Sequence, residues 1–170
     1  MRTSSSSAAF ADEPDKDMQI LSMAVVSTDG QIISSHPHTE PFSIVLKYRV
    51  SNWTEGAHVC MDVFTETGMR LLWTTDVKSV DDLSVERESG VYTARITVPE
   101  MILTPGFYYF SSGIYAPNRI KPFDHRESAV SIEILDGGSL LANFGIKSHA
   151  ATMIPLRWET TLENGERPCR

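Results

Sequence analysis

The segment Gly90-Val-Tyr-Thr-Ala-Arg-Ile-Thr-Val-Pro-Glu-Met-Ile-Leu-Thr-Pro-Gly-Phe-Tyr-Tyr109 decides the fold class of this chain. From Gly90 to Val98 the side chains alternate with a period of two, which is the period of a β-strand. Pro99 cannot donate a hydrogen bond to a neighbouring strand, so it ends this one, and Thr104-Pro105-Gly106 has the residues of a tight turn. A second extended run follows from Phe107 to Ala116. Paired strands with a corner and a turn between them are typical of an antiparallel sandwich.

The rest of the chain repeats this pattern of short strands separated by turns. Further strands are predicted at Met18–Ser27, Phe42–Val50, Ala57–Phe64, Arg70–Thr75 and Ala129–Leu135. Seven or more strands with no long helical period predict an all-β fold, an immunoglobulin-like antiparallel β-sandwich with a C-terminal arm. The alternation places Arg49, Arg95 and Tyr109 in water. It places two sets of side chains together in the core: Phe42, Ile44, Leu46, Tyr48 and Val50 from one strand, and Tyr92, Ala94, Ile96 and Val98 from another.

Composition narrows the classes of partner. The 170 residues carry a formal net charge of −7, so the chain lacks the basic surface that binds nucleic acid. Only two cysteines are present, which favours a reducing compartment over a disulfide-bonded secreted scaffold. No apolar run approaches the length that crosses a membrane.

The chain divides into four parts on composition. Residues 1–17 are rich in serine and charge and are expected to form a flexible linker. Residues 18–136 should form the sandwich. Residues 137–160 follow a Gly-Gly break and are apolar enough to pack on the sandwich or on a second copy, as an arm. Residues 161–170 are expected to be a disordered tail.

Taken in order, these elements resemble the Wzt C-terminal domain family, the C-terminal domain of the ATP-binding subunit of polysaccharide-exporting ABC transporters. The resemblance covers Met18 to Trp158. It rests on five features: a first strand ending in Asp29-Gly30, Phe42-Ser-Ile-Val-Leu-Lys-Tyr-Arg-Val50, Glu66-Thr-Gly68 before Trp73-Thr-Thr75, the segment quoted above, and Ala129-Val-Ser-Ile-Glu-Ile-Leu135 before a closing Arg157-Trp158.

The resemblance implies a sandwich that recognises an exported, O-antigen-like polysaccharide and forms a homodimer by exchanging a C-terminal strand. It implies a place in the cytoplasm, held at the inner membrane through the transporter. The chain has no Gly-rich phosphate loop, so the ATPase domain that would contact the transporter is absent from it. The chain is then either a fragment of a longer ATPase or a free-standing recognition domain.

A site for sugar needs aromatic faces to stack on the ring and planar polar groups to meet the hydroxyls. The outward side chains of the predicted strands supply both, and a loop adds an indole. The predicted ligand-binding residues are Arg49, Trp53, Arg95, Tyr109 and Tyr115, although tyrosine and threonine suit any solvated sheet face. Of the other indoles, Trp73 is expected in the core and Trp158 is expected to fix the arm.

The sequence gives less support to a catalytic or metal-binding function than to sugar binding. His36 and His38 lack a third ligand at a suitable spacing and are expected in a solvated loop, and Asp124-His125-Arg126-Glu127 has no nucleophile beside it. The paired acids between Asp76 and Ser89 fall in an irregular acidic loop. We therefore expect a noncatalytic domain without metal or cofactor. The alternative is a structural domain that dimerises a larger transporter or glycan-modifying enzyme through its arm.

Overall fold

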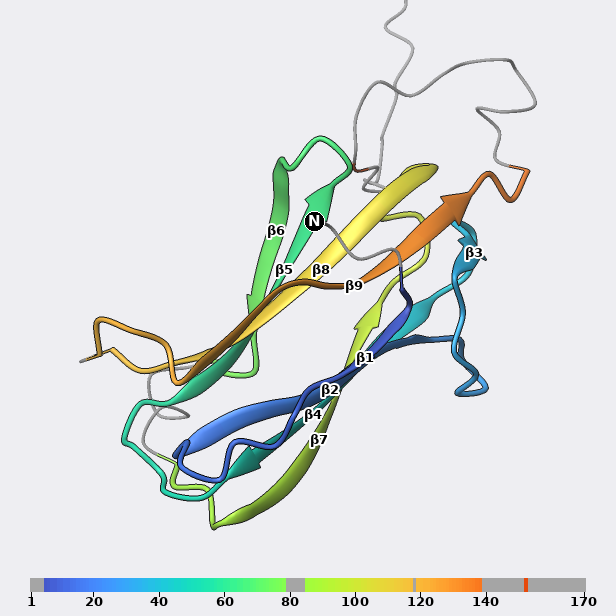
Figure 1. Ribbon diagram of the computed structural model, residues 1–170. Coiled ribbons are helices and arrows are strands. Elements are labelled where there is room, and N and C mark those ends of the chain that lie inside the picture. Colours follow the sequence, from blue (N-terminus) through green and yellow to red (C-terminus); the bar gives the residue numbers. More distant parts are fainter. Residues whose placement is uncertain (1–4, 79–84, 118, 139–151, 153–170) are drawn as a thin grey trace, which may run out of the picture.

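Two β-sheets packed face to face form the molecule (Figure 1). The computed structural model describes residues 5–78, 85–117, 119–138 and 152. The four-stranded sheet has the order β1 (Ser7–Ala9), β2 (Met18–Val26), β4 (Phe42–Val50), β7 (Gly90–Val98). The five-stranded sheet has the order β3 (Ser35–Pro37), β9 (Asp124–Leu135), β8 (Gly106–Tyr115), β5 (His58–Thr65), β6 (Arg70–Thr75). All pairs are antiparallel except β3 with β9, so the prediction of an all-β sandwich is confirmed.

The core lies between the sheets and contains the side chains that the alternation predicted. All five inward residues of β4, from Phe42 to Val50, are buried. Tyr92, Ala94 and Ile96 of β7 pack against that core but are only partly buried. The reason is that β7 is an edge strand, since among the described strands it pairs with β4 alone.

The segment Gly90–Tyr109 does not form a hairpin, contrary to its predicted pairing. Strand β7 belongs to the four-stranded sheet and β8 to the five-stranded sheet, so the turn between them carries the chain across the sandwich. Leu103 is buried in this connection, which shows why the corner between the strands is apolar. Strands joined by a crossing between sheets show the same two-residue alternation as strands joined in a hairpin, so the alternation alone could not distinguish these two connections.

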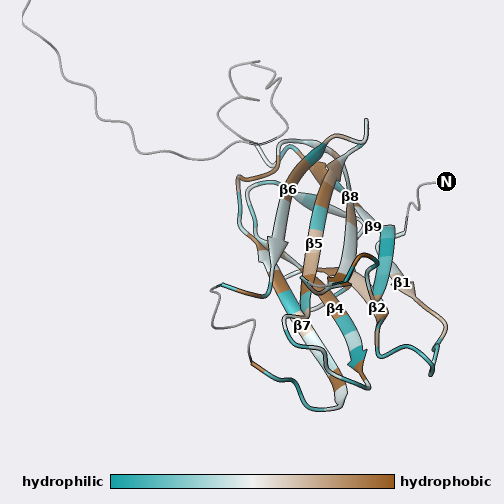
Figure 2. Cartoon of the chain, turned by 90° about the vertical axis from the view of Figure 1, so that its left-hand side faces the viewer, coloured by the Kyte–Doolittle hydropathy of each residue, from teal (hydrophilic) through white to brown (hydrophobic). Residues whose placement is uncertain are grey.

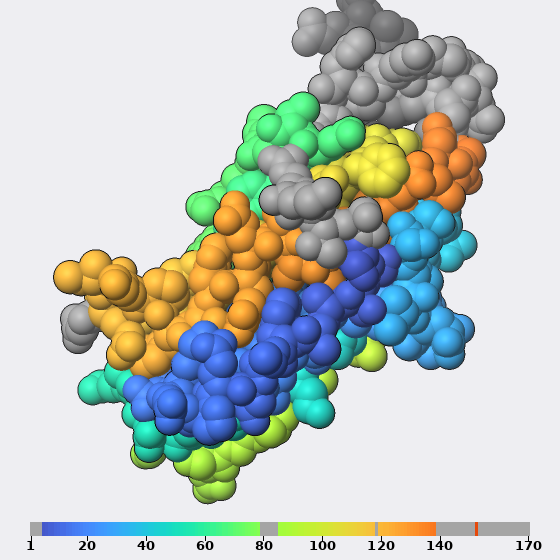
Figure 3. Space-filling view, viewed as in Figure 1, coloured from blue at the N-terminus to red at the C-terminus, as the bar shows by residue number. Residues whose placement is uncertain are grey.

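The prediction of a flexible linker over residues 1–17 is wrong for residues 5–17, and residues 1–4 lie outside the described part. Strand β1 pairs with β2. Just before it, the carbonyl of Ser6 accepts from Val25 N in one sheet, and the carbonyl of Ser5 accepts from Ser131 N in the other. The N-terminal segment therefore closes the sandwich along one side, where Figure 3 shows it against β9.

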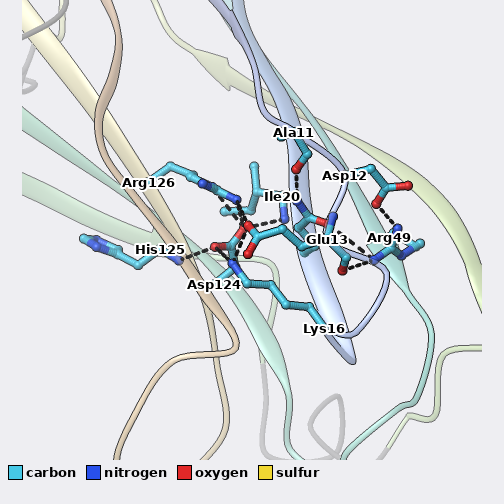
Figure 4. A network of polar contacts seen from close by, with 10 residues as sticks. Ala11, Asp12, Glu13, Lys16, Ile20, Arg49, Asp124, His125 and Arg126 are labelled. Atoms are coloured by element: carbon cyan, nitrogen blue, oxygen red, sulfur yellow. Dashed lines mark hydrogen bonds and ion pairs between the residues drawn. The ribbon is translucent and has the colours of Figure 1, made fainter.

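A network of charges anchors residues 10–17 (Figure 4). Its centre is Asp124, which begins β9 and is only 5% exposed. The Asp124 carboxylate accepts from Ile20 N at 2.9 Å and pairs with Lys16 Nζ and Arg126, each at 3.0 Å. Lys16 Nζ also lies 2.9 Å from Glu13, and the Arg126 guanidinium lies over the Phe10 ring. A polar segment is ordered here because buried partners satisfy its charges.

Two histidines expected in a solvated loop are buried. Residues 35–37 form β3, which runs parallel to the end of β9. His36 lies edge-on to Phe42, with ring centroids 5.8 Å apart, and His38 Nδ1 is 3.2 Å from Gly137 N, which donates to it. The parallel pairing of a three-residue strand with a distant one is a long-range contact that the local sequence does not reveal.

The predicted arm, residues 137–160, is described only at Gly137, Gly138 and Thr152, and Thr152 forms an isolated bridge with Leu103. The expected tail, residues 161–170, and Trp158 lie outside the described residues. Within the described residues there is no helix of the length and apolar character needed to cross a membrane.

Candidate functional site on the outer face of the five-stranded sheet

The outer face of the five-stranded sheet is defined by the alternation of its central strand. In β5, Val59, Met61 and Val63 point into the core. Their neighbours His58, Cys60, Asp62 and Phe64 therefore lie on the opposite face. The strands β6, β5, β8 and β9 stand side by side in Figure 2, so the side chains of four strands meet on this face.

The strand register arranges those side chains in rows, because residues directly opposite each other in an antiparallel pair lie on the same face. One row runs across three strands from Trp73 through Asp62 to Ser111. The next contains Thr75, Cys60, Gly113 and His125. A third contains His58 and Tyr115.

Tyr115 lies flat along this face. A Cβ placed on Gly113 would meet the Tyr115 ring at 2.5–2.8 Å, so the ring covers the space that a side chain at position 113 would fill. Its ring centroid is 6.3 Å from that of His58 and 6.4 Å from that of His125. Burial, with the negative charge of Asp62 as a lesser cause, raises the pKa of the Tyr115 hydroxyl, which therefore remains a hydrogen-bond donor at neutral pH.

Asp62 is the buried charge of the face, at 6% exposure. Arg70 Nε lies 3.0 Å from Asp62 Oδ1, while the Arg70 side chain is 60% exposed. The angle of that contact does not make a hydrogen bond, and no other donor among the described residues reaches Oδ1. The carboxylate oxygen Oδ1 of Asp62 is thus buried with a charge partner but, within the part of the chain that the structure describes, without a hydrogen bond.

Trp73 was predicted in the core and is instead exposed over 52% of its surface. The register of the β5–β6 hairpin shifts between Val63 and Phe64, and it pairs Leu72 with Val63 and Trp73 with Asp62. The partner of Trp73 faces outward, so the indole does as well. Trp73, Asp62 and Arg70 are functional candidates that reasoning from sequence missed. Counting the register outward from the buried Val63 would have found the first two.

Cys60, beneath the same face, is not a nucleophile. The side chain is buried, and burial raises the pKa of its thiol to about 11. A thiol with that pKa is almost wholly protonated at neutral pH, whereas the thiolate is the reactive form.

The five predicted ligand residues are not brought together. Tyr109 and Tyr115 lie on the outer face of the five-stranded sheet, while Arg49 and Arg95 lie on the outer face of the other sheet. Trp53, in the loop after β4, packs against the core, and the Arg87 guanidinium lies 5.3 Å from the centroid of its ring. The predicted ligand residues therefore do not form one surface, because β8 and the pair β4–β7 are in different sheets.

Arg49 and Arg95 have different surroundings. Arg49 pairs with Asp12 and donates to the carbonyl of Glu13, so it anchors the N-terminal segment. Arg95 is exposed at the rim of an apolar groove of about 230 Å³ between the two sheets, where edge strands β6 and β7 face each other. A structural role accounts for Arg49, while Arg95 stays available to solvent.

A second hollow, of about 330 Å³, lies at the other end of the outer face, beside Tyr109. Phe107 and Tyr109 supply aromatic surface there, and Ser131 and Glu133 supply polar groups. Along β8, Tyr109 and Tyr115 are six residues apart, a span of about 20 Å. The face is long enough to contact several sugar units of an extended chain.

Metal chemistry has no evident site in this part of the chain. Among the described residues, no group of three or more His, Cys, Asp or Glu side chains is placed to hold a metal ion. His36 and His38, the pair weighed from the sequence, are buried among core and backbone contacts.

The fold and this face define a class, an all-β sandwich of immunoglobulin type with aromatic and polar side chains gathered on one open sheet. The sequence model of the Wzt C-terminal domain family matches residues 14–146, and the chain belongs to this family. A crystal structure of the C-terminal domain of Wzt has the same fold, with a TM-score of 0.64 and 14% identity over 88% of this chain and 90% of that chain. No curated protein sequence matches the chain. Membership of the family associates the chain with ABC exporters of polysaccharide.

Proposed function

We propose that this chain is a noncatalytic domain that recognises a bacterial surface polysaccharide, O-antigen-like in kind, for an ABC exporter. The observation that supports this best is the group of Trp73, Asp62 and Tyr115 on one open sheet face. An exposed indole offers a flat apolar surface for a sugar ring, and a carboxylate beside it offers an acceptor for hydroxyl groups. Family membership supports the exporter context.

The proposed binding residues differ in part from those predicted from the sequence. Tyr109 and Tyr115 are retained, because both lie on the five-stranded face. Trp73, Asp62 and Arg70 join them. Arg49 and Trp53 are reassigned to structural roles by their contacts, and Arg95 serves as a control residue on the opposite face.

The direct test is a calorimetric titration of the chain with surface polysaccharide purified from the source bacterium. We expect saturable binding, and we expect Trp73→Ala to weaken it while Arg95→Ala leaves it unchanged. Absence of binding by a folded protein, or equal losses in both variants, would contradict the proposal.

A homodimer and a cytoplasmic position at the inner membrane belong to the same proposal. The apolar composition of residues 137–160 supports a role for the arm in self-association. Light scattering on the chain with and without residues 137–160 tests this role. A molar mass that falls by half on truncation supports the dimer, and an unchanged monomeric mass contradicts it.

A further inference from the structure

The buried carboxylate of Asp62 indicates which chemical group the ligand presents to this face. Buried charges in proteins are almost always paired and hydrogen-bonded, because transfer of an unsatisfied carboxylate from water is costly. Asp62 Oδ1 is buried and has the charge of Arg70 nearby but no hydrogen-bond donor among the described residues. Asp62 stands on the outward side of β5, in the face that Trp73 and Tyr115 flank, and a ligand on this face reaches the buried Oδ1 once a neighbouring side chain such as that of Arg70 moves aside.

We infer that Asp62 accepts a hydrogen bond from a free hydroxyl of the bound sugar, and this inference rests on the proposed function. The ligand at this position is then a neutral sugar ring with an unmodified hydroxyl. A phosphate or methyl group on that oxygen removes the donor. A phosphate also brings a second negative charge toward a carboxylate, which disfavours binding further.

The side chains around Asp62 are consistent with a sugar hydroxyl at this position. Arg70 is largely in solvent, so its charge balances Asp62 while its remaining N–H groups stay available to a second sugar oxygen. The absence of a side chain at Gly113 lets the Tyr115 ring lie against the sheet, and Trp73 on the other side of Asp62 stands out into solvent. A sugar stacked on Trp73 is therefore brought over the row that contains Asp62.

The experiment combines a change in the protein with a change in the ligand. The probes are oligosaccharides released by mild acid from the surface polysaccharide of the source bacterium, used unmodified and after O-methylation of their hydroxyls. Binding of each probe is measured for the wild type, Asp62→Ala and Asp62→Asn, with Glu100→Ala as a control carboxylate outside the face. Thermal unfolding of each variant establishes that it is folded.

We expect Asp62→Ala to weaken binding of the unmodified probe by about tenfold to a hundredfold, the range for a hydrogen bond to a charged group. Asp62→Asn keeps an acceptor oxygen and should lose less. The methylated probe should bind the wild type and Asp62→Ala equally weakly, and Glu100→Ala should match the wild type with both probes.

Arg70→Ala separates ligand contact from a structural role for Asp62. If Asp62 only positions Arg70, then Asp62→Ala and Arg70→Ala will lose equal affinity and will keep the wild-type sensitivity to methylation. That result overturns the inference and leaves glycan recognition intact. Binding of neither probe by the folded wild type overturns the proposed function and this inference together, and equal binding of both probes by the wild type overturns the inference alone.

Discussion

The two outer faces of this sandwich are built from the same strand alternation but have different contents. The four-stranded face carries Lys47, Thr93 and Arg95 in water, and Arg49 is held there by the N-terminal segment. The five-stranded face carries an exposed indole, a tyrosine lying along the sheet and a buried carboxylate. On the four-stranded face Lys47 and Arg95 extend into solvent, whereas on the five-stranded face Tyr115 lies against the sheet and Asp62 is buried. The comparison shows that the two faces differ in the side chains they present, and the exposed indole beside a buried carboxylate favours the five-stranded face as the recognition surface that we propose.

The largest effect on stability is expected from a substitution of Asp124, which anchors the N-terminal segment. This segment covers one side of the sandwich, whereas the five-stranded face is open. Asp124→Ala would leave Ile20 N without an acceptor and Lys16 and Arg126 without their buried partner. We expect the free energy of unfolding to fall by about 3–5 kcal/mol in urea denaturation. Asp124→Asn keeps an acceptor and should lose less. A loss below about 1 kcal/mol for the alanine variant would show that residues 10–17 are not anchored there.

The substitution Trp73→Ala tests whether the five-stranded face, and not the four-stranded face, binds polysaccharide. Removal of the indole should weaken polysaccharide binding by about 2 kcal/mol, as for an aromatic residue at the centre of an interface. The same substitution should leave stability nearly unchanged, because the side chain is more than half exposed. Arg95→Ala is the matched change on the four-stranded face, and a similar loss of affinity in that variant would remove the distinction between the faces.

The substitution Gly113→Ala should disturb the five-stranded face and should reduce stability less than Asp124→Ala does. The Cβ would meet the Tyr115 ring, so the ring must swing away from the sheet. We expect a stability loss of about 1 kcal/mol, at the low end for overpacking because the ring lies at the surface. Weaker polysaccharide binding should accompany it. Gly90→Ala on β7 is the control, since its Cβ would meet nothing within 4 Å.

The smallest expected effect is a dependence on pH from the N-terminal network. A hydrogen bond from Lys16 lowers the pKa of Glu13 below its ordinary 4.5, which means that the folded state favours the carboxylate. The stability from this contact is therefore present above about pH 4.5 and is lost as pH falls through the lowered pKa. Melting temperatures of the wild type and Glu13→Gln should converge between pH 6 and pH 3. A constant difference between the two proteins over that range would exclude the contribution.

Local sequence was sufficient for the core and for most strands. The alternation in β4 predicted its buried set residue by residue, and the predicted strands Ala57–Phe64 and Arg70–Thr75 correspond to β5 and β6. These features depend on neighbours in the chain, since a period of two and a turn residue act over a few positions. The C-terminal domain resemblance, stated from the order of the elements, was confirmed by the family match.

The sequence did not reveal features that depend on contacts between distant residues. The crossing from β7 to β8 separated Arg49 and Arg95 from Tyr109 and Tyr115. A shift in register turned Trp73 outward. Burial of Asp124 against Lys16, 108 positions away in sequence, ordered a segment whose composition predicted a linker. Each outcome depends on the pairing of strands far apart in the chain, which composition and period do not encode.

The most direct test of glycan recognition by the five-stranded face is an NMR titration of the isotopically labelled chain with the surface polysaccharide of the source bacterium. Amide shifts should change for β5, β6 and β8 around Asp62, Trp73 and Gly113, and should stay constant for β4 and β7. Changes confined to β4 and β7, or no changes at saturating polysaccharide, would contradict the account.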